Sequence, residues 1–200
     1  MKRNQNPDIT QTGEQRQRSR QLDLLMEILD WAKYILFAIL LGLLIVTFVI
    51  QRNSVIGHSM DDTLHDQDQL IVEKVSKWFN GIKAGDIVTI TTAGLPYHPG
   101  DVHIVKRVIG EPGDTIEIRD HAVYRNGELL VEPYVSCEVD TDPHNDQYST
   151  VTLKEDEYYV MGDNRCNSTD SRFFGPVHKD LIIGEVLLRI SPLNKFGVPR

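Results

Sequence analysis

Cysteine is scarce in this chain of 200 residues, which contains two, Cys137 and Cys166. Two cysteines are too few for the disulfide framework that stabilises many small secreted domains, and we expect both to be free thiols. A basic surface is also lacking, because the formal net charge is −8. Up to Lys33, six basic residues oppose five acidic ones, so the remaining chain carries −9. This balance argues against nucleic acid as a partner, since proteins that bind it present a basic face.

Beyond Ile50 the sequence lacks a helical hydrophobic period of useful length, and it contains no internal repeat. Short runs of β-branched residues alternate there with turn signals, which predicts a mostly antiparallel β domain. The apolar run 181–188 is too short for a second membrane span and carries Glu185, so we expect a buried strand. Strands are predicted at residues 69–74, 86–91, 103–109, 115–118, 122–124, 158–161 and 182–190.

Two turn signals punctuate this pattern. Residues 112–114, Pro-Gly-Asp, predict a turn. Residues 126–127, Asn-Gly, lie between two apolar segments and give the strongest hairpin signal of the chain. Residues 136–150 are polar and acidic, which is typical of a surface loop or insertion.

One long hydrophobic run is present, at residues 34–50, and it contains no charged residue. At the rise of an α-helix it spans roughly 25 Å, enough for a membrane span flanked by Lys33 at the interface. Basic residues at 16, 18, 20 and 33 oppose Arg52 alone on the other side, so we expect the amino end to be cytoplasmic. The predicted organisation is a cytoplasmic tail at 1–33, a signal anchor at 34–50 and an extracytoplasmic domain at 51–200.

Trp78 and Phe79 have two interpretations that the sequence does not separate. Aromatic side chains favour the membrane–water interface, so the pair is a candidate lipid contact. Equally, both are candidate core or hairpin residues.

Ser59 follows the apolar run closely, and Lys106 lies about forty-seven residues further on. A serine hydroxyl is a poor nucleophile unless a base removes its proton during the attack. A lysine can be that base if burial disfavours its charged form. On an extended strand Lys106 shares a face with Ile104 and Val108, which are apolar. Taken alone, each residue is typical of a loop serine or a solvated edge; together they favour a nucleophile and its base.

Other basic side chains are poor candidates for the base. Arg107 faces the opposite side of the strand, and its guanidinium stays protonated. His103 also lies on the opposite face from Lys106, and His58 points away from Ser59 in an extended chain.

Residues 161–175 are dense in Gly, Asp, Asn, Ser and Arg. This composition is typical of an ordered turn held by bonds from side chains to the backbone. Ion pairs between Asp170 and Arg172, or between Asp163 and Arg165, would make it rigid.

Four separate blocks together resemble the ordered motifs of bacterial type I signal peptidases. They are Gly57-His58-Ser59-Met60 with Thr63-Leu64, then Gly85-Asp86-Ile87-Val88, then Lys106-Arg107-Val108-Ile109-Gly110 with Pro112-Gly113-Asp114, and last Gly162-Asp163-Asn164-Arg165 with Ser168, Asp170-Ser171-Arg172 and Gly175. The resemblance covers the chain from the span to about Val177. The single amino-terminal span is similar to the Gram-positive form.

The resemblance implies a membrane-anchored antiparallel β-sheet catalytic domain of the Ser-Lys type that signal peptidases share with self-cleaving repressors. It implies a serine endopeptidase that removes signal peptides from exported preproteins, with Ser59 as nucleophile and Lys106 as general base. The Ser59 backbone N–H would stabilise the oxyanion. The supporting residues under this resemblance are Met60, Arg107, Ser168, Asp170 and Arg172.

Preproteins and membrane lipid are the partners implied, and the translocation machinery is a further candidate. No cofactor is implied, and His65 with its acidic neighbours is expected to be solvated rather than to hold a metal. Gly57 stands where some members carry a serine that helps the oxyanion hole, so the second donor is unassigned. His58, Asp62 and Cys166 also differ from the usual pattern.

Two alternatives remain. A self-cleaving repressor would need a DNA-binding module where this chain has its apolar span. A membrane-tethered β domain that binds partners and has lost activity would fit the departures around Ser59, although the presence of both dyad residues argues against it.

Overall fold

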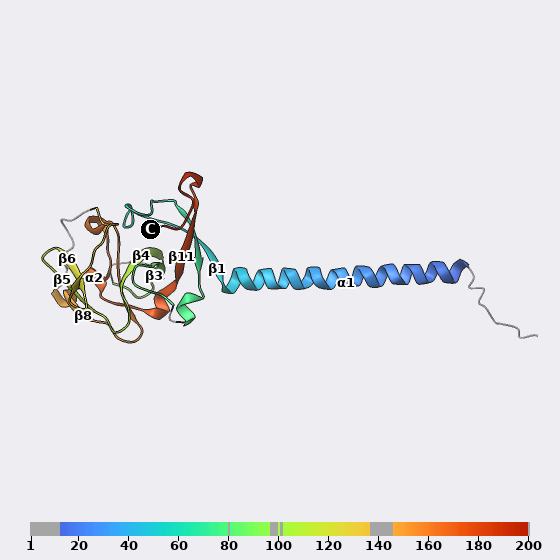
Figure 1. Cartoon of the computed structure of the whole chain (residues 1–200), viewed down its shortest axis with the longest axis horizontal. Helices are drawn as coiled ribbons and strands as arrows, with labels where there is room; N and C mark the ends of the chain where they lie inside the picture. Colours follow the sequence, from blue (N-terminus) through green and yellow to red (C-terminus); the bar gives the residue numbers. More distant parts are fainter. Residues whose placement is uncertain (1–12, 80, 97–99, 101, 137–145, 200) are drawn as a thin grey trace, which may run out of the picture. The chain divides into compact units, whose positions relative to one another are not determined.

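The computed structural model describes residues 13–79, 81–96, 100, 102–136 and 146–199. The chain divides into two compact units at Ile45 and Val46. Helix α1 (Gly13–Phe48) makes up the described part of the first unit and ends within the second (Figure 1). Residues 20–48 of this helix are long and apolar enough to cross a membrane. Their large hydrophobic side chains are exposed, which fits a single-pass anchor whose solvent is lipid.

The second unit contains two antiparallel sheets within the described residues. The larger has seven strands in the order β1-β2-β11-β3-β4-β9-β10. Its strands are β1 (Ile50–Ser54), β2 (Gln69–Glu73), β3 (Ile87–Thr91), β4 (His103–Gly110), β9 (Glu157–Met161), β10 (Val177–His178) and β11 (Ile182–Ser191).

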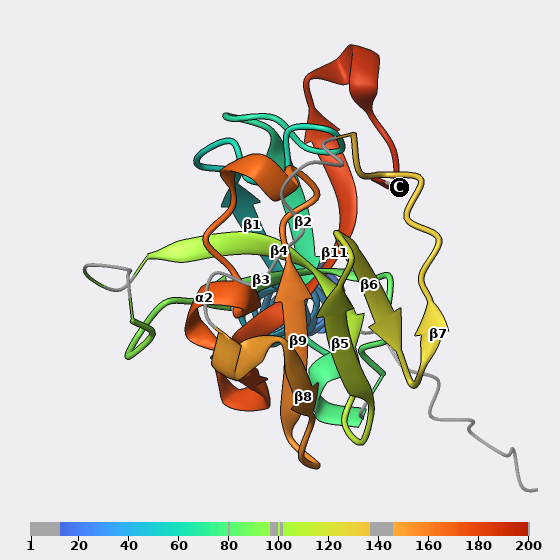
Figure 2. The same ribbon diagram turned by 90° about the vertical axis from the view of Figure 1, so that its left-hand side faces the viewer.

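The smaller sheet has four strands in the order β7-β6-β5-β8 over the same part of the chain. Its strands are β5 (Thr115–Arg119), β6 (Ala122–Arg125), β7 (Glu128–Leu129) and β8 (Thr150–Thr152). Figure 2 shows β5, β6 and β7 as neighbours, with β9 of the larger sheet beside them. The predicted β class is therefore confirmed.

The remaining described elements of this unit are short. They are the single-turn helix α2 (Ser171–Phe174) and the 3₁₀ turns η1 (Ser76–Phe79), η2 (Asp146–Tyr148), η3 (Arg165–Asn167), η4 (Lys179–Leu181) and η5 (Leu193–Lys195).

The predicted hairpin joins β6 to β7. Tyr124 lies opposite Leu129 across the two-residue turn. Asn126 and Gly127 have φ angles of 55° and 82°, which is the pair of positive values that a type I′ turn demands. Asn and Gly adopt these angles at low cost, and the turn therefore fixes the register of the hairpin.

The seven predicted strands are all present. Strands β1, β8 and β10 were not predicted, and β7 was predicted only as the second arm of the Asn126-Gly127 hairpin. β1 was not predicted because its first residue, Ile50, belongs to the apolar run 34–50 and the residues after it are polar, without β-branched residues. β8 and β10 have three and two residues, too few to show an alternating pattern.

A hydrophobic cluster holds the loop that follows β1. Met60 and Leu64 from this loop are buried together with Leu70 and Val72 of β2 and Val105 of β4. Burial of a large apolar side chain contributes about 1.5–3 kcal/mol, so the loop is held by packing as well as by hydrogen bonds. Ser59 lies directly before one of these anchors.

Trp78 and Phe79 lie on η1 and are 71% and 79% exposed. The core interpretation of these two residues is therefore wrong. Their lack of burial leaves the interfacial interpretation as a prediction.

Candidate active site

Lys106 is a buried lysine on β4, with 2% of its surface exposed. The strand register places it opposite Val88 of β3. Its pKa falls from 10.5 to about 8, chiefly because burial disfavours the charged ammonium, while the negative charges of Asp170 and Asp163 oppose that shift. The interpretation of a solvated edge is therefore wrong for this residue.

Ser168 connects Lys106 to a buried carboxylate. Lys106 Nζ donates a hydrogen bond to Ser168 Oγ at 3.1 Å, and Ser168 Oγ donates to Asp170 Oδ2 at 2.6 Å. Because the single hydroxyl proton of Ser168 goes to the carboxylate, its oxygen can only accept from Lys106. The bond therefore fixes one N–H of the amine. In a neutral amine it leaves the lone pair free to point elsewhere.

Asp170 organises the segment that carries Ser168. Its carboxylate accepts from the Gly162 N–H at 3.0 Å and from Nε and Nη2 of Arg172, each at 2.9 Å. Both members of this ion pair are fully buried. Burial alone would raise the pKa of Asp170, but the bonds and charge of Arg172 outweigh it and the pKa is lowered. The predicted pair of Asp170 and Arg172 is confirmed.

Ser59 lies in the loop between β1 and β2, which is hydrogen-bonded to the segment 162–164. The Ser59 carbonyl accepts from the Asn164 N–H at 3.1 Å, and the Asn164 side chain donates to the His58 carbonyl at 2.9 Å. The thioether sulfur of buried Met60 accepts a hydrogen bond from the Asp163 N–H at 3.4 Å. The position of the candidate nucleophile is thus set by partners about a hundred residues away in sequence.

Gly162 brings the two serines together. A Cβ at this position would overlap both the Ser59 carbonyl oxygen and the Ser168 hydroxyl. Ser59 and Ser168 are therefore packed against a backbone position that only glycine fits, and Ser168 in turn accepts a hydrogen bond from Lys106. In the described part of the chain no hydrogen bond joins Ser59 Oγ directly to Lys106 Nζ.

The backbone N–H of Ser59 has no hydrogen-bond partner among the described residues, as an oxyanion donor requires. By contrast, the Gly57 N–H donates to Asp66 Oδ1 at 2.9 Å, so it is already engaged. His58 is exposed and faces Asp61, with 3.0 Å between Nδ1 and Oδ2. The structure therefore offers Ser59 itself as a donor and does not assign a second one.

Arg107 lies on the other face of β4 and is also buried. Its Nε and Nη2 donate to the two oxygens of Asp163 at 2.9 and 2.7 Å, and Nη1 donates to the Gly85 carbonyl at 2.8 Å. The Thr63 hydroxyl donates to the same carboxylate at 2.5 Å, and the Tyr134 ring stacks 4.0 Å from the guanidinium carbon. Arg107 therefore ties β4 to the Ser59 loop and to the segment at 162–164.

The predicted ion pair between Asp163 and Arg165 is absent from the described structure. Asp163 pairs with Arg107, while Arg165 binds Glu132 through two bonds of 2.9 and 2.5 Å. Arg165 is 1% exposed, so its charge needs a carboxylate partner. Glu132 supplies that partner from beyond the β6–β7 hairpin, a distance in sequence that no local pattern reveals.

The expectation of free thiols is also wrong, because Cys166 on η3 is disulfide-bonded. The other cysteine of the sequence, Cys137, lies outside the described residues. A count of cysteines does not give the distance between them, and that distance decides whether they pair.

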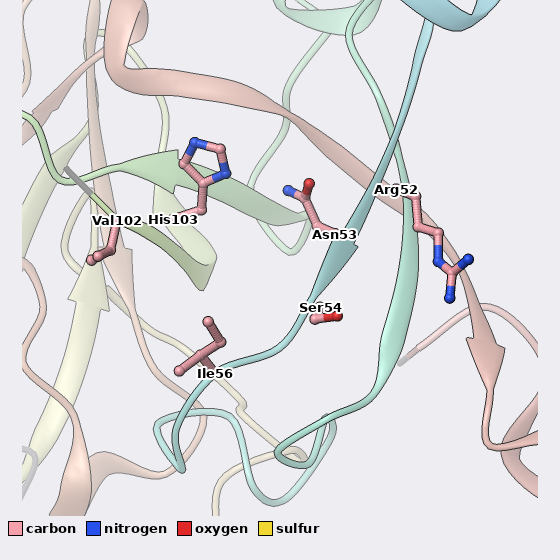
Figure 3. A pocket seen from close by; sticks show the side chains of 6 residues that line it. All are labelled: Arg52, Asn53, Ser54, Ile56, Val102 and His103. Carbon is pink, nitrogen blue, oxygen red and sulfur yellow. The ribbon is translucent and has the colours of Figure 1, made fainter.

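A cavity of about 330 Å³ lies between β1 and the start of β4. Figure 3 shows its lining residues, which are Arg52, Asn53, Ser54, Ile56, Val102 and His103. β1 is an edge strand of its sheet in the described structure, and β9 pairs with β4 only from Arg107 onward. Among the described residues, 103–106 therefore have one edge without a partner strand. Such edges can form backbone hydrogen bonds with an extended peptide.

The model of a known peptidase family matches most of this chain. The family model described as "Signal peptidase, peptidase S26" covers residues 28–191. The chain belongs to the signal peptidase family.

Curated relatives agree with this membership. Signal peptidase I T of Bacillus subtilis (strain 168) is 38% identical over 173 residues, which cover 84% of this chain and 87% of the relative. Signal peptidase I of Bacillus amyloliquefaciens is 38% identical over 174 residues, covering 84% and 90%. A crystal structure of a signal peptidase I from Enterococcus faecalis V583 aligns with 52% of this chain and 95% of its own, at 32% identity and a TM-score of 0.42.

Sequence reasoning assigned no role to three residues of this signal peptidase that hold the site together. Thr63 and Tyr134 both contact the Arg107–Asp163 pair, and Glu132 neutralises Arg165. Thr63 was quoted with Leu64 as part of a motif, but its hydrogen bond to Asp163 was not predicted. Glu132 and Tyr134 follow a hairpin without any local signal.

Proposed function

We propose that this enzyme cleaves preproteins with Ser59 as nucleophile and Lys106 as general base. Membership of the signal peptidase family, together with relatives named signal peptidase I, supports removal of signal peptides as its reaction. The observation that carries the residue assignment is the buried amine of Lys106, which is hydrogen-bonded to Ser168, whose side chain shares the space around Gly162 with the Ser59 carbonyl. No observation supports the alternative of a tethered domain without activity.

The lowered pKa makes Lys106 available as a base. A pKa of about 8 leaves roughly a tenth of the amine neutral at pH 7, against about one part in three thousand for an ordinary lysine. Neutral Lys106 takes the Ser59 hydroxyl proton as Oγ attacks the carbonyl carbon of the cleaved bond. The resulting ammonium then gives that proton to the departing amine nitrogen.

The ester left on Ser59 is hydrolysed by the reverse sequence. Lys106 removes a proton from an attacking water, the carbonyl–Oγ bond breaks, and the proton returns to Ser59. In both steps the Ser59 N–H donates to the oxyanion, a contribution whose removal typically costs about 10²–10³ in rate.

The preprotein is proposed to bind as an added strand. The free edges of β1 and of residues 103–106 flank the cavity beside the Ser59 loop. A peptide extended between them forms main-chain hydrogen bonds with either strand and presents alternate side chains to the cavity.

The proposed membrane topology rests on the charges on either side of the uncharged stretch 34–50. Basic residues at 16, 18, 20 and 33 favour a cytoplasmic amino end, which would place residues 51–200 outside the cytoplasm. In this arrangement α1 contacts lipid, and preproteins that leave the translocation machinery reach the cavity from the same side.

A cleavage assay with the detergent-solubilised full chain and one labelled preprotein tests the assignment. Ser59→Ala and Lys106→Ala are each expected to lower kcat by at least about 10³-fold, because the two groups act as a unit. Lys83→Ala and Ser76→Ala are the matched controls. Lys83 is an exposed lysine in a surface ion pair with Glu111, and both controls should cleave like the parent.

Thermal unfolding of each variant separates chemistry from folding. The assignment requires that the two dyad variants unfold like folded proteins and still fail to cleave. If folded Ser59→Ala or Lys106→Ala retains the parent rate, the dyad is wrong.

A further inference from the structure

Asn53 on β1 is a buried amide with an unused donor. Its side-chain oxygen accepts from Gln51 Nε2 at 2.8 Å, which fixes the other atom of the amide as Nδ2. Nδ2 is buried and has no hydrogen-bond partner among the described residues, while the whole residue is 8% exposed. Buried polar groups are nearly always hydrogen-bonded in folded proteins, so this donor calls for a partner from outside the chain.

The unused donor belongs to a residue that lines the cavity next to the Ser59 loop. Figure 3 shows Asn53 pointing from β1 to the side on which Ile56, Val102 and His103 lie, whereas Arg52 points the opposite way. No carboxylate is among the described residues that line the cavity. The cavity therefore offers a hydrogen-bond donor and contains no acidic group that would compete for it.

A peptide added to β1 would bring side chains to this donor. Asn53 and Val55 are buried, whereas Arg52, Ser54 and Ile56 are exposed, so inward and outward positions alternate. Directly opposite residues on one face of paired strands have Cβ atoms about 4.5–5.5 Å apart. One inward-facing side chain of the peptide would thus lie within hydrogen-bonding reach of Asn53.

We propose that Asn53 makes this peptidase selective for preproteins with a hydrogen-bond-accepting side chain, such as that of threonine, at one position before the cleaved bond. The inference rests on the proposed function, because it places the preprotein along β1. An apolar side chain of the same shape would leave the buried Asn53 amide without a hydrogen-bond partner. The resulting loss of binding free energy would disfavour such preproteins.

Thr89 provides a matched control within the same fold. Its hydroxyl on β3 is the other buried side-chain group without a hydrogen-bond partner in the described residues. Thr89 is fully buried and does not line the cavity. Removing its hydroxyl takes away a buried polar group that has no partner, as Asn53→Leu does for Nδ2, and leaves the peptide site intact.

The test compares substrates that differ by one group. The full chain in detergent cleaves a preprotein series in which each of the six residues before the bond is Thr or Val in turn. At one position the parent is expected to show about a tenfold higher kcat/KM for Thr than for Val. Asn53→Leu, which keeps the shape and removes the donor, should bring that ratio to about one. Thr89→Val should leave it near ten.

The parent ratios decide the inference even if Asn53→Leu does not fold. A parent that cleaves the Thr and Val series equally at all six positions overturns the role of Asn53 and leaves the dyad untouched. An unchanged ratio in folded Asn53→Leu overturns it too. A parent that cleaves no substrate refutes the proposed function, and the inference falls with it.

Discussion

The two faces of β4 each carry a buried basic side chain, and they differ in the partners that compensate its charge. On one face Arg107 has both oxygens of Asp163, the Gly85 carbonyl and an aromatic ring as partners. On the other face Lys106 is equally buried, and the one hydrogen bond of its amine within the described residues goes to the neutral hydroxyl of Ser168. Neighbouring residues on one strand thus have similar burial and very different compensation of charge.

This difference separates a structural cation from a reactive one. A buried charge is retained when it is paired and hydrogen-bonded, as Arg107 is. Without a paired carboxylate, a lysine gives up its proton instead, and its pKa falls. The same burial therefore rigidifies the site through Arg107 and supplies the base through Lys106.

Replacing each cation by the other type, one at a time, should show the largest difference in catalysis. Lys106→Arg is expected to lower kcat by at least about 10³-fold, because a guanidinium does not release its proton near neutral pH. Arg107→Lys keeps the charge and loses the two-pronged contact, so cleavage should stay within about tenfold of the parent. Steady-state kinetics on one preprotein measure both. Equal losses would mean that the two faces do not differ in function.

Removing each charge should change stability in opposite directions. Arg107→Met leaves Asp163 buried and unpaired, which is expected to cost about 3–5 kcal/mol in the free energy of unfolding. Lys106→Met removes a poorly compensated charge and should stabilise the fold by about 1–3 kcal/mol at pH 7. Urea unfolding of the solubilised chain measures both.

The stability gain of Lys106→Met should also depend on pH. Below pH 8 the buried lysine is charged in the folded chain, and its full destabilising effect is present. Above pH 8 this destabilisation decreases, and it vanishes near pH 10.5, which is the pKa of the lysine in the unfolded chain. A gain that stays constant from pH 7 to pH 10 would contradict the depressed pKa.

Cleavage itself should rise with pH through the pKa of Lys106. From pH 6 to pH 8 the neutral fraction grows from about one in a hundred to about a half, so kcat/KM should increase roughly fiftyfold. Arg107→Lys should follow the same profile with the same midpoint. A rate that peaks near pH 4 would indicate carboxylate chemistry instead.

A smaller effect is expected from two serines of one segment. Ser168→Ala removes the only hydrogen bond that orients Lys106 in the described structure, so kcat should fall about tenfold with little change in KM. Ser171→Ala removes a bond from the Val160 N–H and should lower the unfolding temperature without this effect on kcat. Equal kcat values for the two variants would show that Ser168 does not orient Lys106 for catalysis.

Local patterns predicted much of this molecule. The strand at 103–109 was recognisable because its alternation is long, and the Asn126-Gly127 turn because its residues fit positive φ. The contacts between distant segments were not recognisable. Arg107 and Asp163 are 56 residues apart in sequence, and Arg165 and Glu132 are 33 apart, so no window contains both partners. The motifs indicated which residues form the site, whereas the fold of the sheet decides which of them form ion pairs.

Direct titration of Lys106 tests the central claim most closely. In the chain labelled with ¹³C at lysine Cε, the Lys106 resonance can be assigned as the one that Lys106→Met removes, and its shift followed from pH 6 to pH 11 by NMR. We expect a midpoint of about 8. A midpoint near 10.5 would show that Lys106 remains a charged ammonium at neutral pH, and would contradict its role as the base.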